Sequence, residues 1–363
     1  MDTIVESSDL WRGIPELQGN PRALSSPRER LAALRRAGEA LHHRFMAEPI
    51  LPWAASVALA RVPYPAWYAF SGVNAQKLMS GGMIHLMARV GVFQFDDFDG
   101  ARRTLLFNPH DLERGRETPF FKRMAQGMPE ALGNLIAPMY QTVPSALKEL
   151  GVSPAEVDYL FYDHLHTQDL RGWLGQGRAQ GQFPNARLLV HRAEWDSVQG
   201  LLPSQADWYC PDGGAGIPSD RVLVFNESIQ LGHGIALVHT PGHTMGNCSL
   251  VFRGPEGVHV SSENGVASDS WAPEHSKVDA IRRYARATGS EVVLNGNTQE
   301  GSVEQYLSMV LEKAIAGPAT NHPFSNVIPS SEATPHWLFR AAPRSHLWGD
   351  VRFGKKELGG GQA

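Results

Sequence analysis

Short strand-like segments separated by turns fill residues 220–264, and they constrain the fold more than any other feature of the sequence. Val, Ile and Leu dominate the segments, and Gly or Pro stands between them, as in "DRVLVFNESIQLGHGIALVHTPGHTMGNCSLVFRGPEGVHVSSEN". Apolar runs of the same kind begin at Met83 and are broken by "DFDG", which is typical of a hairpin turn. Helical patterns follow both groups of strands. Two strand-rich halves that each end in helices predict an α/β fold in which two sheets pack together with helices outside, an αββα sandwich.

The same patterns indicate where the chain divides. The sandwich is expected to follow a helical extension, to contain a mostly helical insert, and to be followed by a C-terminal tail. The predicted parts are an N-terminal extension at 1–75, the sandwich domain at 76–315 with its insert near 112–150, and a C-terminal extension at 316–363.

A long amphipathic helix is predicted within the N-terminal extension. Ser26 and Glu29 form the pattern of a capping box, and apolar residues recur at helical spacing from Leu31 to Phe45. Gly38 interrupts this stripe, at a cost of about 1 kcal/mol relative to alanine. Because the stripe would otherwise be exposed, we expect the helix to dock on the sandwich.

Several other segments predict single elements. "SPAEVDYLFYD" contains a second capping box followed by a buried strand, and "FPNARLLVHRAEWDSV" is typical of a strand followed by a helix. "PEHSKVDAIRRYARATGSEVVLNGN" predicts a helix and then a strand. The aromatic-rich "VPYPAWYAFSG" either lines a pocket or packs in the core, and the sequence leaves both uses open.

Composition excludes several classes of partner. The chain has 363 residues, of which 42% are hydrophobic and 19% charged, and its formal net charge of −4 lacks the basic excess typical of nucleic-acid binding. The acidic start "MDTIVESSDLW" and the lack of an apolar stretch of about 20 residues predict a cytoplasmic protein without a membrane partner. Its two cysteines are too few for a disulfide framework or a thiolate zinc site. Assembly into a homo-oligomer stays open.

Two short motifs bring histidines together. His164 and His166 end the apolar run "EVDYLFY", where imidazoles at i and i+2 can point into one cleft, and His243 lies in the turn "TPGHT". Three neutral imidazoles suit Zn²⁺ or Fe²⁺ and leave a coordination position open for water, as in catalytic metal sites. Four other histidines are expected to be ordinary core residues, namely His85, His191, His239 and His259.

The segments "LKELGVSPAEVDYLFYDHLHTQDLRGWL" and "LVHTPGHTMGNCSLVF" resemble the metallo-β-lactamase superfamily, in the order and spacing typical of that superfamily. The resemblance covers about residues 83 to 300. It implies an αββα sandwich whose site lies at one edge between the sheets. It also implies that His164, His166 and His243 are the three histidine ligands of the first metal site.

The resemblance implies that the second metal site has changed. Gln168 stands where the superfamily has a metal-binding aspartate, and Asp169 stands where it has the fourth histidine. Glu263 takes the place of the bridging aspartate, or Asn264 does if the register shifts by one residue. Asn297 occupies the place of the last histidine.

These oxygen donors suit a hard ion such as Mn²⁺ or Mg²⁺ better than zinc, and neutral amides bind metal weakly. We therefore expect one tightly held divalent ion, zinc first with iron or manganese as alternatives, and at most a weak second site. Asp169 and Glu263 are candidate ligands or candidate proton-transfer groups. Gln168 and Asn297 are candidates for orienting a small-molecule substrate.

The leading functional hypothesis is a metal-dependent hydrolase, in which a metal-bound hydroxide attacks an ester, lactone, thioester or amide carbonyl. Two alternatives stay open. One is an iron oxidoreductase, as in the superfamily's sulfur dioxygenases, and the other is a non-catalytic descendant that only binds a ligand. Nucleotide cofactors are not indicated, because the chain has neither a phosphate-binding loop nor dinucleotide glycine spacing.

Overall fold

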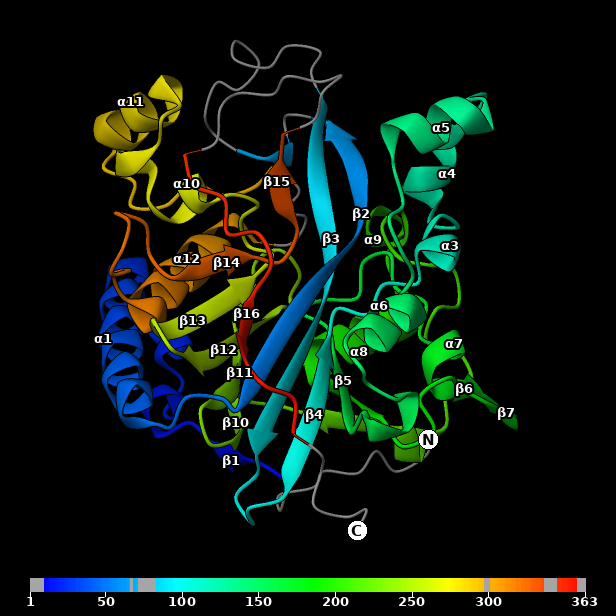
Figure 1. Ribbon diagram of the computed structural model, residues 1–363. Coiled ribbons are helices and arrows are strands. Elements are labelled where there is room, and N and C mark those ends of the chain that lie inside the picture. Colours follow the sequence, from blue (N-terminus) through cyan, green and yellow to red (C-terminus); the bar gives the residue numbers. More distant parts are fainter. Residues whose placement is uncertain (1–9, 66–67, 71–82, 297–300, 336–344, 358–363) are drawn as a thin grey trace.

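A computed structural model describes residues 10–65, 68–70, 83–296, 301–335 and 345–357. Two sheets pack face to face, with helices on both outer sides (Figure 1). The predicted α/β sandwich is therefore confirmed. In the described part of the chain, no helix is both long and apolar enough to cross a membrane.

The smaller sheet holds six strands and carries one of the two histidine motifs. Most neighbours are antiparallel, and the last pair is parallel. In spatial order its strands are β1 (Arg12–Gly13), β10 (Ile229–Gly232), β11 (Ile235–His239), β12 (Cys248–Gly254), β13 (Gly257–Ser262) and β14 (Val327–Pro329).

The larger sheet holds eight strands and carries the other histidine motif. The predicted hairpin around "DFDG" is confirmed as its central antiparallel pair. In spatial order its strands are β16 (Arg352–Gly354), β2 (Trp53–Pro65), β3 (Met83–Asp96), β4 (Arg102–Phe107), β5 (Tyr159–Phe161), β8 (Arg187–His191) and β9 (Val222–Phe225), and β15 (Glu332–Thr334) pairs with β3 outside this path. A separate ribbon joins β6 (Gly175–Gln176) to β7 (Ala179–Gln180).

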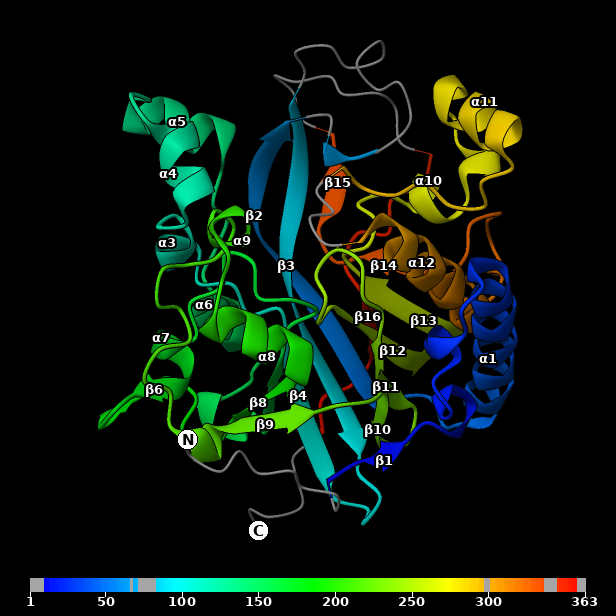
Figure 2. The ribbon, with the colours of Figure 1, turned by 180° about the vertical axis from the view of Figure 1, so that it is seen from behind.

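The helices cover the outer faces of the sheets. Figure 2 shows α1 and α12 beside the smaller sheet and α8 beside the larger one, while α4 and α5 project near the ends of β2 and β3. The α-helices are α1 (Pro27–Ala47), α3 (Leu112–Gly115), α4 (Pro119–Ala125), α5 (Glu130–Ile136), α6 (Val143–Glu149), α7 (Arg171–Leu174), α8 (Arg192–Gln199), α9 (Pro203–Ala206), α10 (Ser268–Trp271), α11 (Asp279–Thr288) and α12 (Ser302–Ala316).

Three apolar layers hold the sandwich together, one between the sheets and one under each set of helices. The alternation of side chains along β3 shows how one strand serves two layers. Val90 and Val92 pack toward α6, whereas Phe93 and Phe95 pack against the smaller sheet. Such period-two burial is what a strand covered on both faces requires.

Helix α1 docks on the sandwich through the predicted apolar stripe. The Ser26 side chain accepts a hydrogen bond from the Glu29 backbone N–H and caps the first turn, and Leu34, Leu41 and Phe45 are buried against α12 and the smaller sheet. A Cβ atom at Gly38 would lie 2.8 Å from the Cβ of Ala314 in α12. The glycine therefore permits a close helix contact, which offsets its low helix propensity.

The strand predicted after α11 is wrong. Val292 and Val293 are buried but belong to no strand. The free edge of β13 is paired instead with β14, which comes from much later in the chain. An apolar run can be buried without pairing, because burial and sheet membership are separate requirements.

Parts of both predicted extensions complete the sheets. β2 lies within residues 1–75 and pairs along its length with β3, while β14, β15 and β16 lie within residues 316–363. The division of the chain at residues 75 and 315 stays a proposal.

Candidate metal centre

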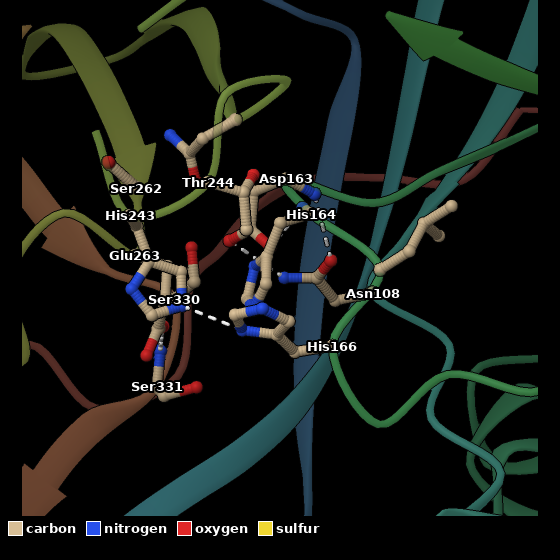
Figure 3. A network of polar contacts seen from close by, with 12 residues as sticks. Asn108, Asp163, His164, His166, His243, Thr244, Ser262, Glu263, Ser330 and Ser331 are labelled. Atoms are coloured by element: carbon tan, nitrogen blue, oxygen red, sulfur yellow. Dashed lines mark hydrogen bonds and ion pairs between the residues drawn. The ribbon is translucent and has the colours of Figure 1, made fainter. Parts of the chain in front are cut away.

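Three histidine side chains meet at the edge of the sandwich. His164 and His166 follow the buried strand β5, and His243 lies in the turn between β11 and β12. Their ring centroids lie 4.5 to 5.0 Å apart, and Figure 3 shows the rings facing one another. Each histidine offers one ring nitrogen, and these three atoms all lie within 4.8 Å of one another. Among the described residues, no other group of three or more His, Cys, Asp or Glu side chains comes together in this way. The predicted histidine triad is therefore brought together by the fold.

The hydrogen bonds decide which ring nitrogens can face a metal ion. Nδ1 of His164 lies 2.8 Å from Oδ1 of Asp163, so Nε2 of His164 is left free. Nδ1 of His166 and Nε2 of His243 lie 3.2 Å apart. Two nitrogens bound to one tetrahedral zinc ion would be about 3.3 Å apart, given metal–nitrogen distances of about 2.0–2.1 Å. The donor set therefore fits a divalent ion.

Electrostatics also suit metal binding. Burial lowers the pKa of His166 and of His243 well below the ordinary histidine value, and both rings are therefore neutral near pH 7. Burial also opposes the charged form of His164, but the neighbouring Asp163 carboxylate raises its pKa overall. The carboxylate of Asp163, held by Asn108 at 3.2 Å, fixes the orientation of the His164 ring, as carboxylates commonly do for metal-binding histidines.

Glu194 connects the two histidine motifs, and the sequence did not single it out. It lies in the first turn of α8 and is 2% exposed. Its Oε1 accepts from the backbone N–H of Leu165 at 2.8 Å and from the hydroxyl of Tyr209 at 3.0 Å, while Oε2 accepts from the hydroxyl of Thr244 at 2.6 Å. One carboxylate thus holds a residue between His164 and His166 and the residue that follows His243.

A glycine makes this connection sterically feasible. A Cβ atom at Gly246 would overlap the backbone of Glu194, so the turn and the start of α8 approach more closely than any side chain allows. Glycine in "TMGN" was visible in the sequence, but its partner was not, because the two segments are about 50 residues apart.

A cavity of about 520 Å³ opens beside the triad. Its polar wall includes His164, His166 and Glu263, and Trp208 also lines it. Its apolar wall comes from β2, β3 and the helices α4 and α5. The apolar wall includes Val62, Pro63, Leu86, Ala88, Phe121, Met124, Met128, Ile136, Ala137 and Met139. Tyr64 and Tyr68 also line it, so part of the aromatic "VPYPAWYAFSG" segment does form a pocket wall.

Comparisons with known proteins agree with this picture. No protein-family profile matches the sequence. A solved structure described as a probable metal-dependent hydrolase from Staphylococcus aureus is 15% identical, covers 71% of this chain and 83% of its own, and superposes with a TM-score of 0.50. The chain has the fold of the metallo-β-lactamase superfamily.

Sequence comparison adds relatives that match only in part. An N-acyl homoserine lactonase of Rhizobium johnstonii is 30% identical over 171 residues, which are 40% of this chain and 60% of that protein. An N-acyl homoserine lactonase of a Bacillus species is 28% identical over 110 residues, 30% of this chain and 38% of that protein. The matched region therefore spans less than two thirds of these relatives.

Gln168, for which the sequence predicted a place at a ligand position, lines the cavity and is hydrogen-bonded to another histidine. Its Nε2 lies 2.6 Å from Nδ1 of His110, and its buried Oε1 has no hydrogen-bond partner in the described residues. His110 follows β4 in "FNPHD", and sequence reasoning did not select it. The only signal was a histidine just beyond the end of a predicted strand.

Asp169 is held by arginines. Arg171 donates to both carboxylate oxygens, at 3.0 and 2.6 Å, and Arg114 lies 3.4 Å away. The carboxyl group is 2% exposed and is not part of the cavity wall. These contacts indicate that Asp169 fixes the conformation of the loop. They do not support its predicted role as a metal ligand or proton-transfer group, which stays a prediction.

Glu263, which the sequence analysis assigned to the place of a bridging aspartate, lines the cavity, and Asn264 does not. Oε2 of Glu263 accepts from the backbone N–H of Ser331 at 2.9 Å. Burial, with repulsion from Asp163, raises the pKa of Glu263 to about 8. Asn264 faces the core, where its Nδ2 donates to Oε1 of Glu312 at 2.7 Å. Of the two candidates, Glu263 therefore lies on the cavity wall, whereas Asn264 accepts from the backbone N–H of His243 at 3.1 Å.

Asn297 lies outside the described residues. Asn295, two residues earlier, lies behind the triad: its Nδ2 is 3.4 Å from Nδ1 of His243 and donates to the backbone carbonyl of Glu263 at 2.9 Å. The sequence pattern "LNGN" offered two asparagines and gave no reason to prefer the first.

The four histidines assigned to the core do not line the cavity. His85, His191 and His259 are buried, as expected. His239 is half-buried and stacks on His191, with ring centroids 3.7 Å apart.

Proposed function

We propose that this protein is a metal-dependent hydrolase that opens lactones or esters with an apolar acyl group. The observation that supports this most directly is the triad of His164, His166 and His243, two of whose members, His164 and His166, line a cavity with mostly apolar walls. Sites that bind acyl compounds combine an apolar pocket with a few convergent polar groups. The partial sequence relatives are lactonases, which favours hydrolysis over the iron oxidoreductase and the binding module.

His164, His166 and His243 would hold one divalent ion, with zinc as the expected metal. Such an ion supplies a water of lowered pKa and polarises a carbonyl oxygen. Asp163 keeps Nε2 of His164 turned toward the ion by binding the opposite ring nitrogen. Glu194 keeps the loops of both motifs in place.

Glu263 is proposed as the proton donor to the leaving oxygen. Burial raises its pKa to about 8 in the metal-free site, which favours a protonated carboxyl group near neutral pH. Because Oε2 accepts from Ser331, the proton resides on Oε1. A protonated carboxyl in the cavity wall can donate to an alkoxide that leaves a cleaved ester, which is general acid catalysis.

The apolar wall favours an acyl chain as the part of the substrate distant from the scissile bond. N-acyl homoserine lactones combine such a chain with a lactone ring, and the partial relatives are named for them. We therefore propose N-acyl lactones as the substrate class.

The experiment that tests this function measures metal content and lactone hydrolysis on the same preparation. Protein purified without added metal should contain about one zinc per chain by elemental analysis, and it should hydrolyse N-acyl homoserine lactones in a pH-stat assay. Iron with oxygen uptake and no hydrolysis would instead support the oxidoreductase. A protein without metal or activity would support the binding module.

Gly133 offers a way to shorten the acyl pocket. It lies in α5 on the cavity wall, and a Cβ atom there would meet only Met128 Sδ, at 3.8 Å. We expect Gly133→Phe to lower kcat/KM for long-chain lactones by about tenfold or more while short-chain substrates are little affected, because the ring would fill space for several methylenes. Ala131→Phe, on the exposed face of the same helix, is the control and should change neither. Equal losses for both chain lengths would contradict an acyl pocket here.

A further inference from the structure

His110 faces the cavity from a segment outside both histidine motifs. It follows β4 and lines the same cavity as His164 and Gln168. Its ring is not part of the triad of ligand atoms, so the geometry gives it no place as a fourth metal ligand. A ring that is next to the candidate metal centre but does not belong to it can contact the substrate.

The hydrogen bond from Gln168 decides where His110 carries its proton. Nε2 of Gln168 lies 2.6 Å from Nδ1 of His110. An amide nitrogen only donates, so Nδ1 of His110 must accept, and the proton of a neutral ring then resides on Nε2. Among the described residues, only Nδ1 of the His110 ring has a hydrogen-bond partner in the protein, and Nε2 has none. Nε2–H is therefore available to a ligand in the cavity.

The neutral form of this ring is supported by its surroundings. Burial lowers the pKa of His110 to about 4. A neutral imidazole can serve as a hydrogen-bond donor to a carbonyl oxygen without giving up its proton, as a histidine does in triosephosphate isomerase.

We propose that His110, held by Gln168 with its proton on Nε2, donates a hydrogen bond to the substrate's carbonyl oxygen as negative charge develops there. The inference rests on the proposed hydrolysis and adds a catalytic residue to it, with Gln168 as a positioning residue. It also gives a physical reason for the glutamine at this position: an aspartate would accept from His110 and favour the opposite tautomer. The proton stays on Nε2 throughout, so no proton transfer is assigned to His110.

The first test is the tautomer of His110 in the zinc-loaded, full-length protein. Histidine labelled with ¹⁵N allows two-bond proton–nitrogen correlations to distinguish protonated from unprotonated ring nitrogens, and the signal is assigned from its loss in His110→Gln. We expect protonation on Nε2, and loss of this preference in Gln168→Met, which keeps the side-chain length but cannot donate. A proton on Nδ1 in the unmodified protein would overturn the proposal.

The second test replaces His110 with glutamine or asparagine, which place an amide hydrogen-bond donor at different positions of the original ring. The amide of a glutamine reaches the position of Nε2, whereas that of an asparagine reaches the position of Nδ1. His110→Asn and His110→Phe should lower kcat by about 10²- to 10³-fold, as the loss of an oxyanion-binding donor does elsewhere. His110→Gln should retain activity within about tenfold, and Gln168→Met should lower kcat more than it raises KM. Metal content should stay unchanged in all four variants.

The outcomes separate this inference from the proposed function. If the unmodified protein hydrolyses lactones and His110→Phe does so equally well, the donor role is wrong and the hydrolase proposal stands. If His110→Asn and His110→Gln lose activity alike, the role of Nε2 is wrong. If the unmodified protein binds metal but hydrolyses no lactone or ester, the proposed function fails and the donor role fails with it.

Discussion

Replacing both His164 and His166 with alanine is expected to remove the metal ion and to lower hydrolysis by at least about 10³-fold. The expectation follows from the loss of two of the three imidazoles whose ligand atoms lie within 4.8 Å of one another. An ion that stabilises transition-state charge supplies several kcal/mol, and about 4 kcal/mol corresponds to about 10³ in rate. Elemental analysis and a lactone assay measure the two effects.

The double variant should still fold, because the apolar layers of the sandwich lie away from the triad. Asp163 loses its histidine partner but keeps Asn108, so we expect a loss of about 1–3 kcal/mol in unfolding free energy. His259→Ala is the matched control: it removes a buried imidazole that does not line the cavity, and it should leave metal content intact. Metal retained in full by the double variant would refute the assignment of the site.

Glu194→Ala is expected to weaken metal binding by about 10- to 100-fold, although Glu194 contacts no metal. Its carboxylate accepts from Leu165, Tyr209 and Thr244, which hold both histidine loops. Loss of partners that orient metal ligands commonly has an effect of this size. Three buried donors would also lose their acceptor, so the unfolding free energy should fall by about 3 kcal/mol or more. Zinc competition with a chelator and urea denaturation measure the two quantities.

Two variants on the same helix make this test specific. Asp196→Ala removes an exposed carboxylate from α8 and should change neither metal affinity nor stability by more than about 0.5 kcal/mol. Glu194→Gln keeps one oxygen acceptor and should give intermediate values. If Glu194→Ala loses stability but binds zinc as tightly as the unmodified protein, Glu194 supports the fold without positioning the ligands.

Local patterns were sufficient for the sandwich architecture and for the three histidines of the candidate metal centre. Apolar runs and turns predicted the strands between β3 and β13, since side-chain direction along a strand depends only on near neighbours. They did not predict β2 or the strands β14 to β16, which lie in the two extensions. The histidines of the two motifs were recognised because their spacing and flanking residues are themselves local. The apolar stripe from Leu31 to Phe45 likewise predicted a docked helix without any knowledge of α12 as its partner.

Contacts between segments that are distant in the chain could not be predicted from the sequence. Glu194, Asn295 and His110 act beside residues about 30 to 60 positions away, and no local spacing marks such pairs. The same limit explains the failed strand at Val292 and Val293, because the edge of β13 had been taken by a strand from residues 327–329.

By itself, the sequence determined a two-sheet sandwich, its docking helix and three histidines able to share one ion. Only the tertiary structure decided that Asp169 is bound by arginines, that Glu263 and not Asn264 faces the cavity, and that Gln168 contacts a fourth histidine. The physical reason is that burial, hydrogen bonding and pKa depend on which groups the fold places within a few ångströms. That proximity is fixed by packing of the whole chain, whereas residue type and spacing are fixed locally.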